Sequence, residues 1–254
     1  MPERYWKRSQ FPLQALMFLL PLLVVYELAL PYVLSDGVQQ VVSDVYARRL
    51  LYRFFEMLDV AAYHLPAVIV VVVLLCWHVA RRDPWRIRPR LYVGMWCESL
   101  VLALPLCAFA ILLQLCGALP DAADGLAATT QAADDWKARM IFAIGAGIYE
   151  ELLFRLIAIS LLHMILIDVL ALPKRPGTLA VVGLSALAFG LYHFPTYDFL
   201  DWDAGQWGRL VFYTGAGVYF AVLFVVRGFG IVAGTHAMYD VLVVLLDMSQ
   251  TNGT

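Results

Sequence analysis

The sequence predicts an all-α polytopic membrane protein, one integral-membrane domain (residues 1–254) with about seven transmembrane helices. Three observations lead to this class. Hydrophobic residues make up 62% of the chain and charged residues only 15%, whereas a soluble domain is usually less than half apolar. The apolar residues fall in runs long enough to cross a bilayer. Basic residues gather in short stretches between those runs, as they do in membrane proteins with a fixed orientation.

Residues 1–136 are predicted to contain three spans. A basic segment precedes an apolar run from Phe11 to Leu34, which is too long for the core of a signal peptide and is therefore expected to be retained. Val38–Asp59 mixes apolar, basic and acidic residues, a pattern that favours an amphipathic helix at the membrane interface. The other two spans predicted here are Val60–Ala80 and Leu91–Ala118.

Four more spans are predicted in the second half of the chain. The first of them is longer than the roughly 20 residues that a bilayer needs, so a tilted, protruding or broken helix is expected. Short turns are expected at Lys174–Gly177 and Arg227–Gly230. The four spans are Met140–Leu172, Leu179–Phe194, Leu210–Val226 and Ile231–Met248.

The loop charges predict an orientation. Arg81–Arg90 holds five arginines and is the most basic stretch, which indicates the cytoplasmic side. Leu119–Trp136 and Pro195–Gly208 are acidic and are expected on the opposite side. The amino terminus is thus predicted inside and the carboxyl terminus outside, as suits a bacterial inner-membrane protein. The formal net charge of -2 gives no sign of a nucleic-acid partner; the lipid bilayer and a membrane-associated protein or peptide are the expected partners. The oligomeric state stays open.

The cysteines are expected to be packing residues. They all lie inside apolar spans and have no C-x-x-C spacing, so neither disulfides nor metal ligation is predicted for them. They are Cys76, Cys97, Cys107 and Cys116.

The segment Gly145–Ile157 places Glu150, Glu151 and Arg155 in a run that is otherwise apolar. Each charged group costs roughly 2.5–3.5 kcal/mol at the centre of a membrane helix, so these groups need a structural or functional role. Glu151 and Arg155 are four residues apart, in the order that favours an ion pair. Glu150 points about 100° away and lacks that partner. On this segment alone, a buried salt bridge and a reactive carboxylate both stay open.

Two further segments place imidazoles inside predicted spans. Phe189 and His193 share one helix face, as do His236 and Asp240. Counting from the loops puts His193 near the outer end of its span and His236 near the inner end of its own, so short, tilted or partly inserted spans, or shifted boundaries, are expected. A structural role, between helices or near the interface, is expected for the other such groups: His64, His78, His163, Glu27, Glu98 and Asp168.

The order E-E-x-x-x-R, F-x-x-x-H and H-x-x-x-N/D resembles the CPBP intramembrane proteases. That family includes the CAAX prenyl endopeptidases of the Rce1 type, bacteriocin-processing and immunity proteins, and the Abi proteins. Here the motifs run Glu150–Arg155, Phe189–His193 and His236–Asp240. All three lie in residues 137–248, the expected catalytic core, and residues 1–136 contain no recognised motif. The resemblance implies a glutamate-dependent endopeptidase with a polar cavity inside the bilayer.

The resemblance also implies roles for the residues. Glu150 and His193 would activate water, and His236 with the residue at Asp240 would stabilise the oxyanion. Asp240 departs from the family pattern, because the best-studied members have Asn there and a carboxylate would repel an oxyanion. Asp240 is therefore expected to orient His236, as an acid does for a catalytic histidine elsewhere. Supporting roles around the site are expected for Glu151, Arg155 and Phe189.

Other chemistries are open alternatives. The zinc motif H-E-x-x-H is absent, so no metal or other cofactor is expected, although Glu150, His193 and His236 are all ligand types. A serine protease built on Ser185 and His236 would leave Glu150 unexplained. An aspartyl protease built on Asp240 lacks the motif for its second acid. A proton-coupled transporter and a non-catalytic immunity or scaffold protein of the same family are the alternatives outside proteolysis.

Overall fold

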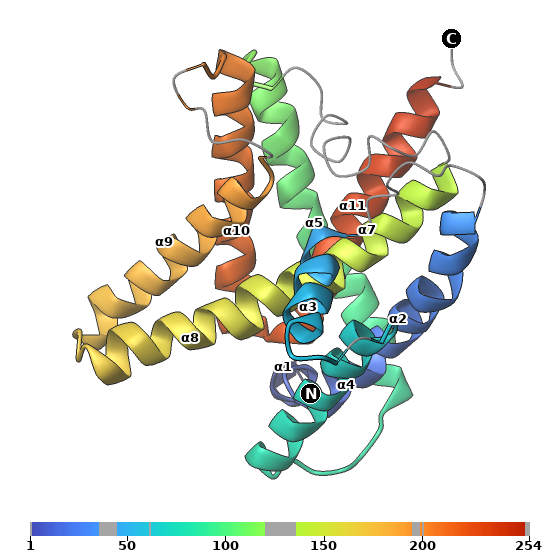
Figure 1. Cartoon of the computed structure of the whole chain (residues 1–254), viewed down its shortest axis with the longest axis vertical. Helices are drawn as coiled ribbons and strands as arrows, with labels where there is room; N and C mark the ends of the chain where they lie inside the picture. The colour runs from blue at the N-terminus through green and yellow to red at the C-terminus, as the bar shows by residue number, and fades with distance from the viewer. Residues whose placement is uncertain are drawn as a thin grey trace.

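The computed structural model describes residues 2–35, 45–60, 62–119, 136–194, 199 and 201–251, and every regular element in them is helical (Figure 1). This confirms the all-α prediction. Six of these helical segments are long and apolar enough to cross a membrane. The helical elements are α1 (Pro2–Ser9), α2 (Pro12–Ser35), α3 (Tyr46–Glu56), α4 (Leu65–Arg81), α5 (Pro89–Leu115), α7 (Trp136–Glu151), the π-helical η1 (Leu152–Ala158), α8 (Ile159–His163), the π-helical η2 (Met164–Val169), α9 (Lys174–Tyr192), α10 (Ala204–Arg227) and α11 (Phe229–Thr251).

The predicted span Val60–Ala80 differs from the other six. Its helix, α4, is apolar but has only 17 residues and begins at Leu65. Pro66 lies in its first turn, where the missing N–H leaves no hydrogen bond unmade and the fixed φ suits a helix start. A turn closed by a hydrogen bond from the Leu65 amide to the Ala62 carbonyl precedes the helix, so α4 is shorter than the predicted span.

The long fourth span is one helical run from Trp136 to Val169. It is not broken, but it changes winding directly after Glu151, where π-helical η1 begins. A π-helical turn holds more residues than an α-helical turn, so it alters which side chains share a face, and such turns are frequent at functional sites. The change of winding thus falls between the two glutamates and the residues that follow them.

Two connections also test the predicted turns. The prediction of a connecting turn at Lys174–Gly177 is wrong, because these residues already belong to helix α9. Pro176 is tolerated there, since the N–H groups of the first helical turn have no partner within the helix. The turn at Arg227–Gly230 is present and even tighter. Only Gly228 separates α10 from α11, and its φ of +80° is a conformation that glycine adopts without strain.

Several predicted loop features fall outside the described residues. The carboxylates of the acidic Leu119–Trp136 loop lie in the segment 120–135, and the segments 38–44 of the amphipathic stretch and 195–198 of the Pro195–Gly208 loop are likewise not described. The described end of that second loop is ordered by Asp203. Its side chain accepts from the Gln206 amide while the Gln206 side chain accepts from the Asp203 amide, a capping box that starts α10.

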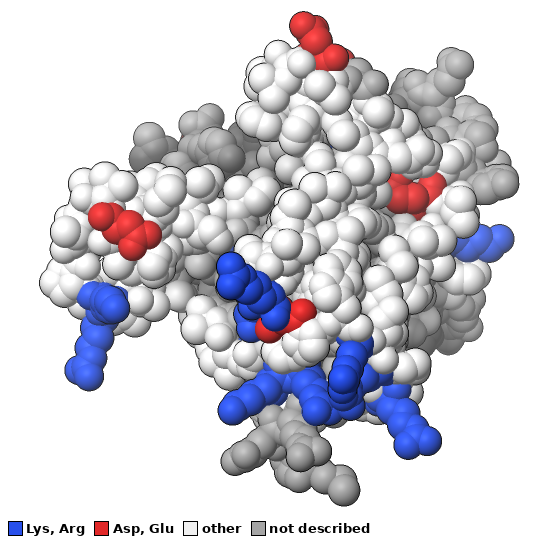
Figure 2. Space-filling view, turned by 90° about the horizontal axis from the view of Figure 1, so that it is seen from below, with Lys and Arg blue, Asp and Glu red and all other residues white. Residues whose placement is uncertain are grey.

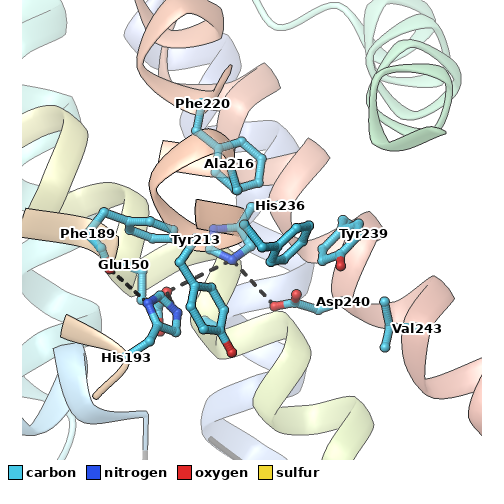
Figure 3. Close-up of a pocket in the computed structure, with 12 residues that line it drawn as sticks. Glu150, Phe189, His193, Tyr213, Ala216, Phe220, His236, Tyr239, Asp240 and Val243 are labelled. Carbon is cyan, nitrogen blue, oxygen red and sulfur yellow. Dashed lines mark hydrogen bonds and ion pairs between the residues drawn. The ribbon is translucent and has the colours of Figure 1, made fainter. Parts of the chain in front are cut away.

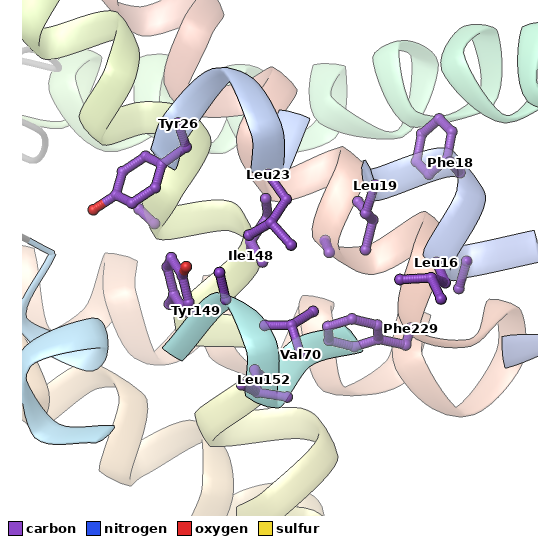
Figure 4. Packing of buried hydrophobic residues seen from close by; sticks show 14 of the residues in the cluster. Leu16, Phe18, Leu19, Leu23, Tyr26, Val70, Ile148, Tyr149, Leu152 and Phe229 are labelled. Carbon is purple, nitrogen blue, oxygen red and sulfur yellow. The ribbon is translucent and has the colours of Figure 1, made fainter. Parts of the chain in front are cut away.

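Helix α11 lies at the centre of the bundle, in contact with α7, α5, α2 and α10. In its most apolar window 72% of the residues are buried, against 22% for α5. Close packing with α7 depends on Gly147, since a Cβ there would lie 2.5 Å from the Ala237 amide nitrogen. Beside this contact, apolar side chains of α2, α4, α7 and α11 fill one core cluster (Figure 4). The rigid α7–α11 pair therefore positions the residues of both helices relative to each other.

Two buried ion-pair networks join the amino-terminal helices to this core. Glu27 of α2 accepts from Tyr149 at 2.7 Å, pairs with Arg48 of α3 at 3.3 Å, and contacts His64 Nδ1 at 2.6 Å. These contacts explain how one intramembrane carboxylate and a buried arginine are accommodated, because each charge has a partner of opposite sign.

The second network closes the turn between α10 and α11. Arg227 is buried and binds Glu98 with two nitrogens, at 2.5 and 2.7 Å. Tyr5 of α1 donates to the same carboxylate at 2.5 Å, and burial and the nearby carboxylate raise the pKa of Tyr5 so that the hydroxyl stays a donor. The α1 helix is thereby joined to α5 and to the last residue of α10.

Basic side chains gather on the end of the molecule that carries the α4–α5 connection. Figure 2, seen from below, shows most of the lysine and arginine side chains of this face close together, while much of the remaining surface is uncharged. The connection contributes Arg82, Arg86 and Arg88, and Arg81 pairs with Asp83 at 2.9 Å.

Candidate active site

Three helices bring the predicted site residues to one place (Figure 3). Glu150 lies near the end of α7, His193 directly follows α9, and His236 lies in α11. Glu150 Oε2 is 3.8 Å from His193 Nε2 and 3.9 Å from His236 Nε2. All three side chains are almost fully buried, with exposures of 3% for Glu150 and 6% for each histidine. The difference in depth that counting from the loops indicates is therefore absent, and Figure 1 shows why: α9 and α11 both run obliquely through the bundle.

The hydrogen bonds of His193 define which ring nitrogen is free. Its Nδ1 is 2.8 Å from the Phe189 carbonyl oxygen, which can only accept, so Nδ1 carries the proton. The neutral ring then presents the lone pair of Nε2 toward Glu150. Tyr213 stacks on the ring with centroids 4.0 Å apart and planes 11° apart, and Phe189 contacts it edge-on at 4.8 Å. Stacking and hydrogen bond together fix the ring orientation.

His236 is held by carboxylates on both sides. Its Nδ1 is 2.9 Å from Glu151 Oε1, and its Nε2 is 3.5 Å from Asp240 Oδ2. Phe220 stacks on the ring at 4.6 Å. The residue that orients Nδ1 is thus Glu151, whereas Asp240 faces the other nitrogen, on the cavity side. Each ring nitrogen of His236 therefore lies beside a carboxylate oxygen.

The ion pair predicted between Glu151 and Arg155 is present, with Arg155 Nε 3.1 Å from Glu151 Oε2 and both side chains fully buried. The guanidinium also lies over the Phe189 ring, 4.7 Å from its centroid. Arg155 therefore neutralises Glu151 and supports the ring beside His193, while Glu150 forms no ion pair with an arginine or lysine among the described residues.

A small cavity opens at the three polar side chains. The space available to the centres of water molecules is about 40 Å³, and a buried water needs only about 10–15 Å³ on that measure. Glu150 Oε2 is buried, and no described group hydrogen-bonds it. The distances of 3.8 and 3.9 Å are too long for direct hydrogen bonds and suit a bridging water. The lining residues are Ala146, Glu150, Phe189, His193, Phe212, Tyr213, Ala216, Phe220, His236, Tyr239, Asp240 and Val243.

The structure brings together Glu150, His193, His236 and Asp240 and keeps Ser185 apart. Ser185 donates to the Phe154 carbonyl at 2.9 Å and does not line the cavity, so a serine–histidine pair is not formed. Within the described part of the chain, no three carboxylate, imidazole or thiol groups are arranged as ligands of one metal ion.

Two aromatic residues of the site, unlike Phe189, were not predicted from the sequence. Tyr213 and Phe220 of α10 stack on the two histidines, and nothing in the α10 sequence distinguishes them from the other aromatic residues of an apolar span.

These features define an all-helical membrane protein with a buried glutamate–histidine cavity in its carboxyl-terminal half. The family model of the type II CAAX prenyl endopeptidases, Rce1-like, matches residues 133–242. This part of the chain contains all three motifs and is similar to the Rce1-like family. No curated protein and no solved structure matches the chain.

Proposed function

We propose that the protein is an intramembrane endopeptidase in which Glu150 and His193 activate a water molecule. The observation that carries the proposal is the placement of two imidazole nitrogens within 4 Å of one buried carboxylate oxygen in a cavity of water size. Amide hydrolysis needs a base for water and a donor for the oxyanion, and these groups supply both. No metal or other cofactor takes part in the proposed reaction.

In the proposed reaction, water lies between Glu150 Oε2 and His193 Nε2. The Nε2 lone pair accepts a hydrogen bond from the water, whose hydrogen stays on the oxygen, and Glu150 removes the other hydrogen as a proton while the water oxygen attacks the scissile carbonyl carbon. Glu150 then passes that proton to the leaving nitrogen as the C–N bond breaks. One acid–base group thus serves both steps, and no covalent enzyme intermediate forms.

His236 is the proposed oxyanion donor. Its Nδ1–H is held by Glu151, and its Nε2–H faces the cavity with Asp240 at 3.5 Å. That distance exceeds a normal hydrogen bond, so the Nε2–H is available to donate to the oxygen that gains charge. Asp240 and Glu151 together favour the imidazolium form, which offsets the repulsion that a carboxylate exerts on the oxyanion.

The proposed substrate is a membrane-associated or lipid-anchored protein or peptide. The cavity is lined mainly by apolar and aromatic groups, which suits a chain segment that enters from the bilayer. The matched family is named for prenylated CAAX substrates, and a prenylated carboxyl-terminal peptide is therefore the first substrate to test. We further propose that the basic end of Figure 2 faces the cytoplasm of a bacterial inner membrane, with the amino terminus inside and the carboxyl terminus outside.

The proposal is tested by reconstituting purified protein in liposomes with a library of lipid-anchored peptides. We expect cleavage products whose summed mass exceeds that of the substrate by one water, and no products with His193→Ala protein. Absence of cleavage by a well-folded parent across prenylated, acylated and transmembrane peptides would contradict the proposal and favour a non-catalytic immunity or scaffold role.

A further inference from the structure

Asp240 differs from two neighbouring carboxylates of α7 and α11 in having no basic side chain as a partner. Glu151 pairs with Arg155. Asp247, two turns further along α11 than Asp240, pairs with Arg139. Among the described residues, no lysine or arginine pairs with Asp240, although only 8% of its side chain is exposed. A charge on Asp240 is therefore poorly solvated and has no cation of its own.

The charges around the cavity do not balance in the state that the proposed reaction requires. His236 lies within 4 Å of three carboxylates, those of Glu150, Glu151 and Asp240. Even as an imidazolium, His236 together with Arg155 supplies two positive charges against these three negative ones. An uncompensated charge in a buried site is costly. A proton on Glu150 would compensate it but would remove the base, whereas a cation on the substrate would leave the base intact.

The cavity face of α11 places the Asp240 carboxylate close to the scissile bond. His236, Asp240 and Val243 follow one another along this face (Figure 3). Four residues of an α-helix rise by about 6 Å, which is the length of about two residues of an extended peptide. When the scissile carbonyl oxygen lies at His236, a substrate side chain one or two residues away can reach Asp240.

The surroundings of Asp240 fit an ammonium group on an apolar stem. Tyr239 and Val243 lie next to it (Figure 3), and Phe212 also lines the cavity, with its ring centroid 6.1 Å from that of Tyr239. A lysine carries a compact ammonium on a flexible four-carbon stem, and such a stem packs on apolar surface while the charged head reaches a polar group. The space of about 40 Å³ for the centres of water molecules suits this compact head.

We propose that Asp240 is a specificity-determining residue that binds the ammonium group of a substrate lysine one or two residues from the scissile bond. The bound ammonium supplies the missing positive charge. It also weakens the repulsion between Asp240 and the oxyanion that forms at His236, so it favours the reaction as well as binding. The inference rests on the proposed endopeptidase function and narrows its substrates.

The kinetic test uses lipid-anchored peptides with lysine placed in turn at the two positions on either side of the cleaved bond. Each is compared with the peptide that has methionine there. At one of these positions, the parent should cleave the lysine peptide with a kcat/KM about 10- to 100-fold higher, the range for a hydrogen bond to a charged group. In Asp240→Asn the ratio should fall to about one. A loss of activity common to both peptides cancels in this ratio.

Asp247→Asn is the matched control, because it removes a carboxylate of the same helix that has its own arginine, and it should keep the parent ratio. A parent that cleaves the lysine and methionine peptides equally well at every position would overturn the lysine site and leave the endopeptidase function standing. An Asp240→Asn protein that keeps the parent ratio would do the same.

A second measurement does not depend on cleavage. Peptide binding to His193→Ala protein, which should not consume the peptide, is measured in nanodiscs of phosphatidylglycerol, a lipid without an amine. The lysine peptide should bind with a Kd about 10- to 100-fold lower than its acetylated form, which has lost the charge, and the difference should vanish in His193→Ala/Asp240→Asn. Equal Kd values for the two peptides in His193→Ala would overturn the site even if the double variant failed to fold. A parent that cleaves nothing, together with Asp240-dependent binding of lysine, would refute the endopeptidase function and leave the lysine site standing.

Discussion

Removing the buried arginine gives the sharpest stability prediction. Arg155 is fully buried, and the carboxylate that it pairs with is Glu151, at 3.1 Å. In Arg155→Met the apolar stem remains, but Glu151 keeps a buried charge without its cation. Breaking a buried pair in this way costs about 3–5 kcal/mol. With about 2.1 cal/mol/K of unfolding entropy per residue, as in globular proteins, this corresponds to about 6–9 °C in Tm for a chain of 254 residues.

The double variant Glu151→Gln/Arg155→Met tests the cause of that loss. It removes both charges, and the amide oxygen that replaces the Glu151 carboxylate can still accept from His236 Nδ1, so most of the lost stability should return. Both variants are compared with the parent by thermal unfolding in one detergent. An unpaired Glu151 charge would not be the cause of the loss if Arg155→Met melted with the parent, or if the double variant were no more stable than Arg155→Met alone.

Three further results are expected. Tyr213→Leu removes the ring stacked on His193 and should lower kcat about two- to tenfold, the equivalent of about 0.5–1.5 kcal/mol of ring contact. Tyr213→Phe keeps the ring, so an equal loss of kcat in that variant would show that the ring is not responsible. Gly147→Ala places a Cβ 2.5 Å from the Ala237 amide nitrogen and should lower the stability of the protein by about 1–3 kcal/mol. Gly183→Ala is the control, because a Cβ there meets nothing within 4 Å, and it should keep the parent Tm. Equal Tm values of the two variants would contradict the importance of the close contact at Gly147. Metal-free protein should stay active, and elemental analysis that finds stoichiometric zinc, lost with activity in His193→Ala, would establish a zinc site instead.

The order of the helices and their apolar character could be predicted because both are local properties of the sequence. The ion pair of Glu151 with Arg155 follows from a spacing of four residues, and the tight turn at Gly228 follows from its glycines. Short-range geometry on a single helix is fixed by the backbone repeat, so it can be read before the fold is known.

The contacts between helices could not be predicted in the same way. That Glu151 also binds Nδ1 of His236, and that Asp240 faces Nε2, depends on the rotation of α7 against α11. The apolar pattern predicts neither the π-helical turns after Glu151 nor the oblique course of α9. Counting residues from the loops therefore placed His193 and His236 at different depths. The contact between Tyr46 of α3 and Tyr192 at the end of α9 also depends on the packing of helices, and no sequence motif predicts it.

Glu150→Gln tests most directly whether Glu150 is the base for water. The amide keeps the shape of the side chain and cannot take the proton. Cleavage by reconstituted protein, measured per folded molecule, should fall by at least about 100-fold, the lower end of what a positioned base contributes. Glu98→Gln is the control, because that carboxylate is held by Arg227 and Tyr5 outside the cavity, and its activity per folded molecule should match the parent. Undiminished cleavage by Glu150→Gln would show that Glu150 is not the base.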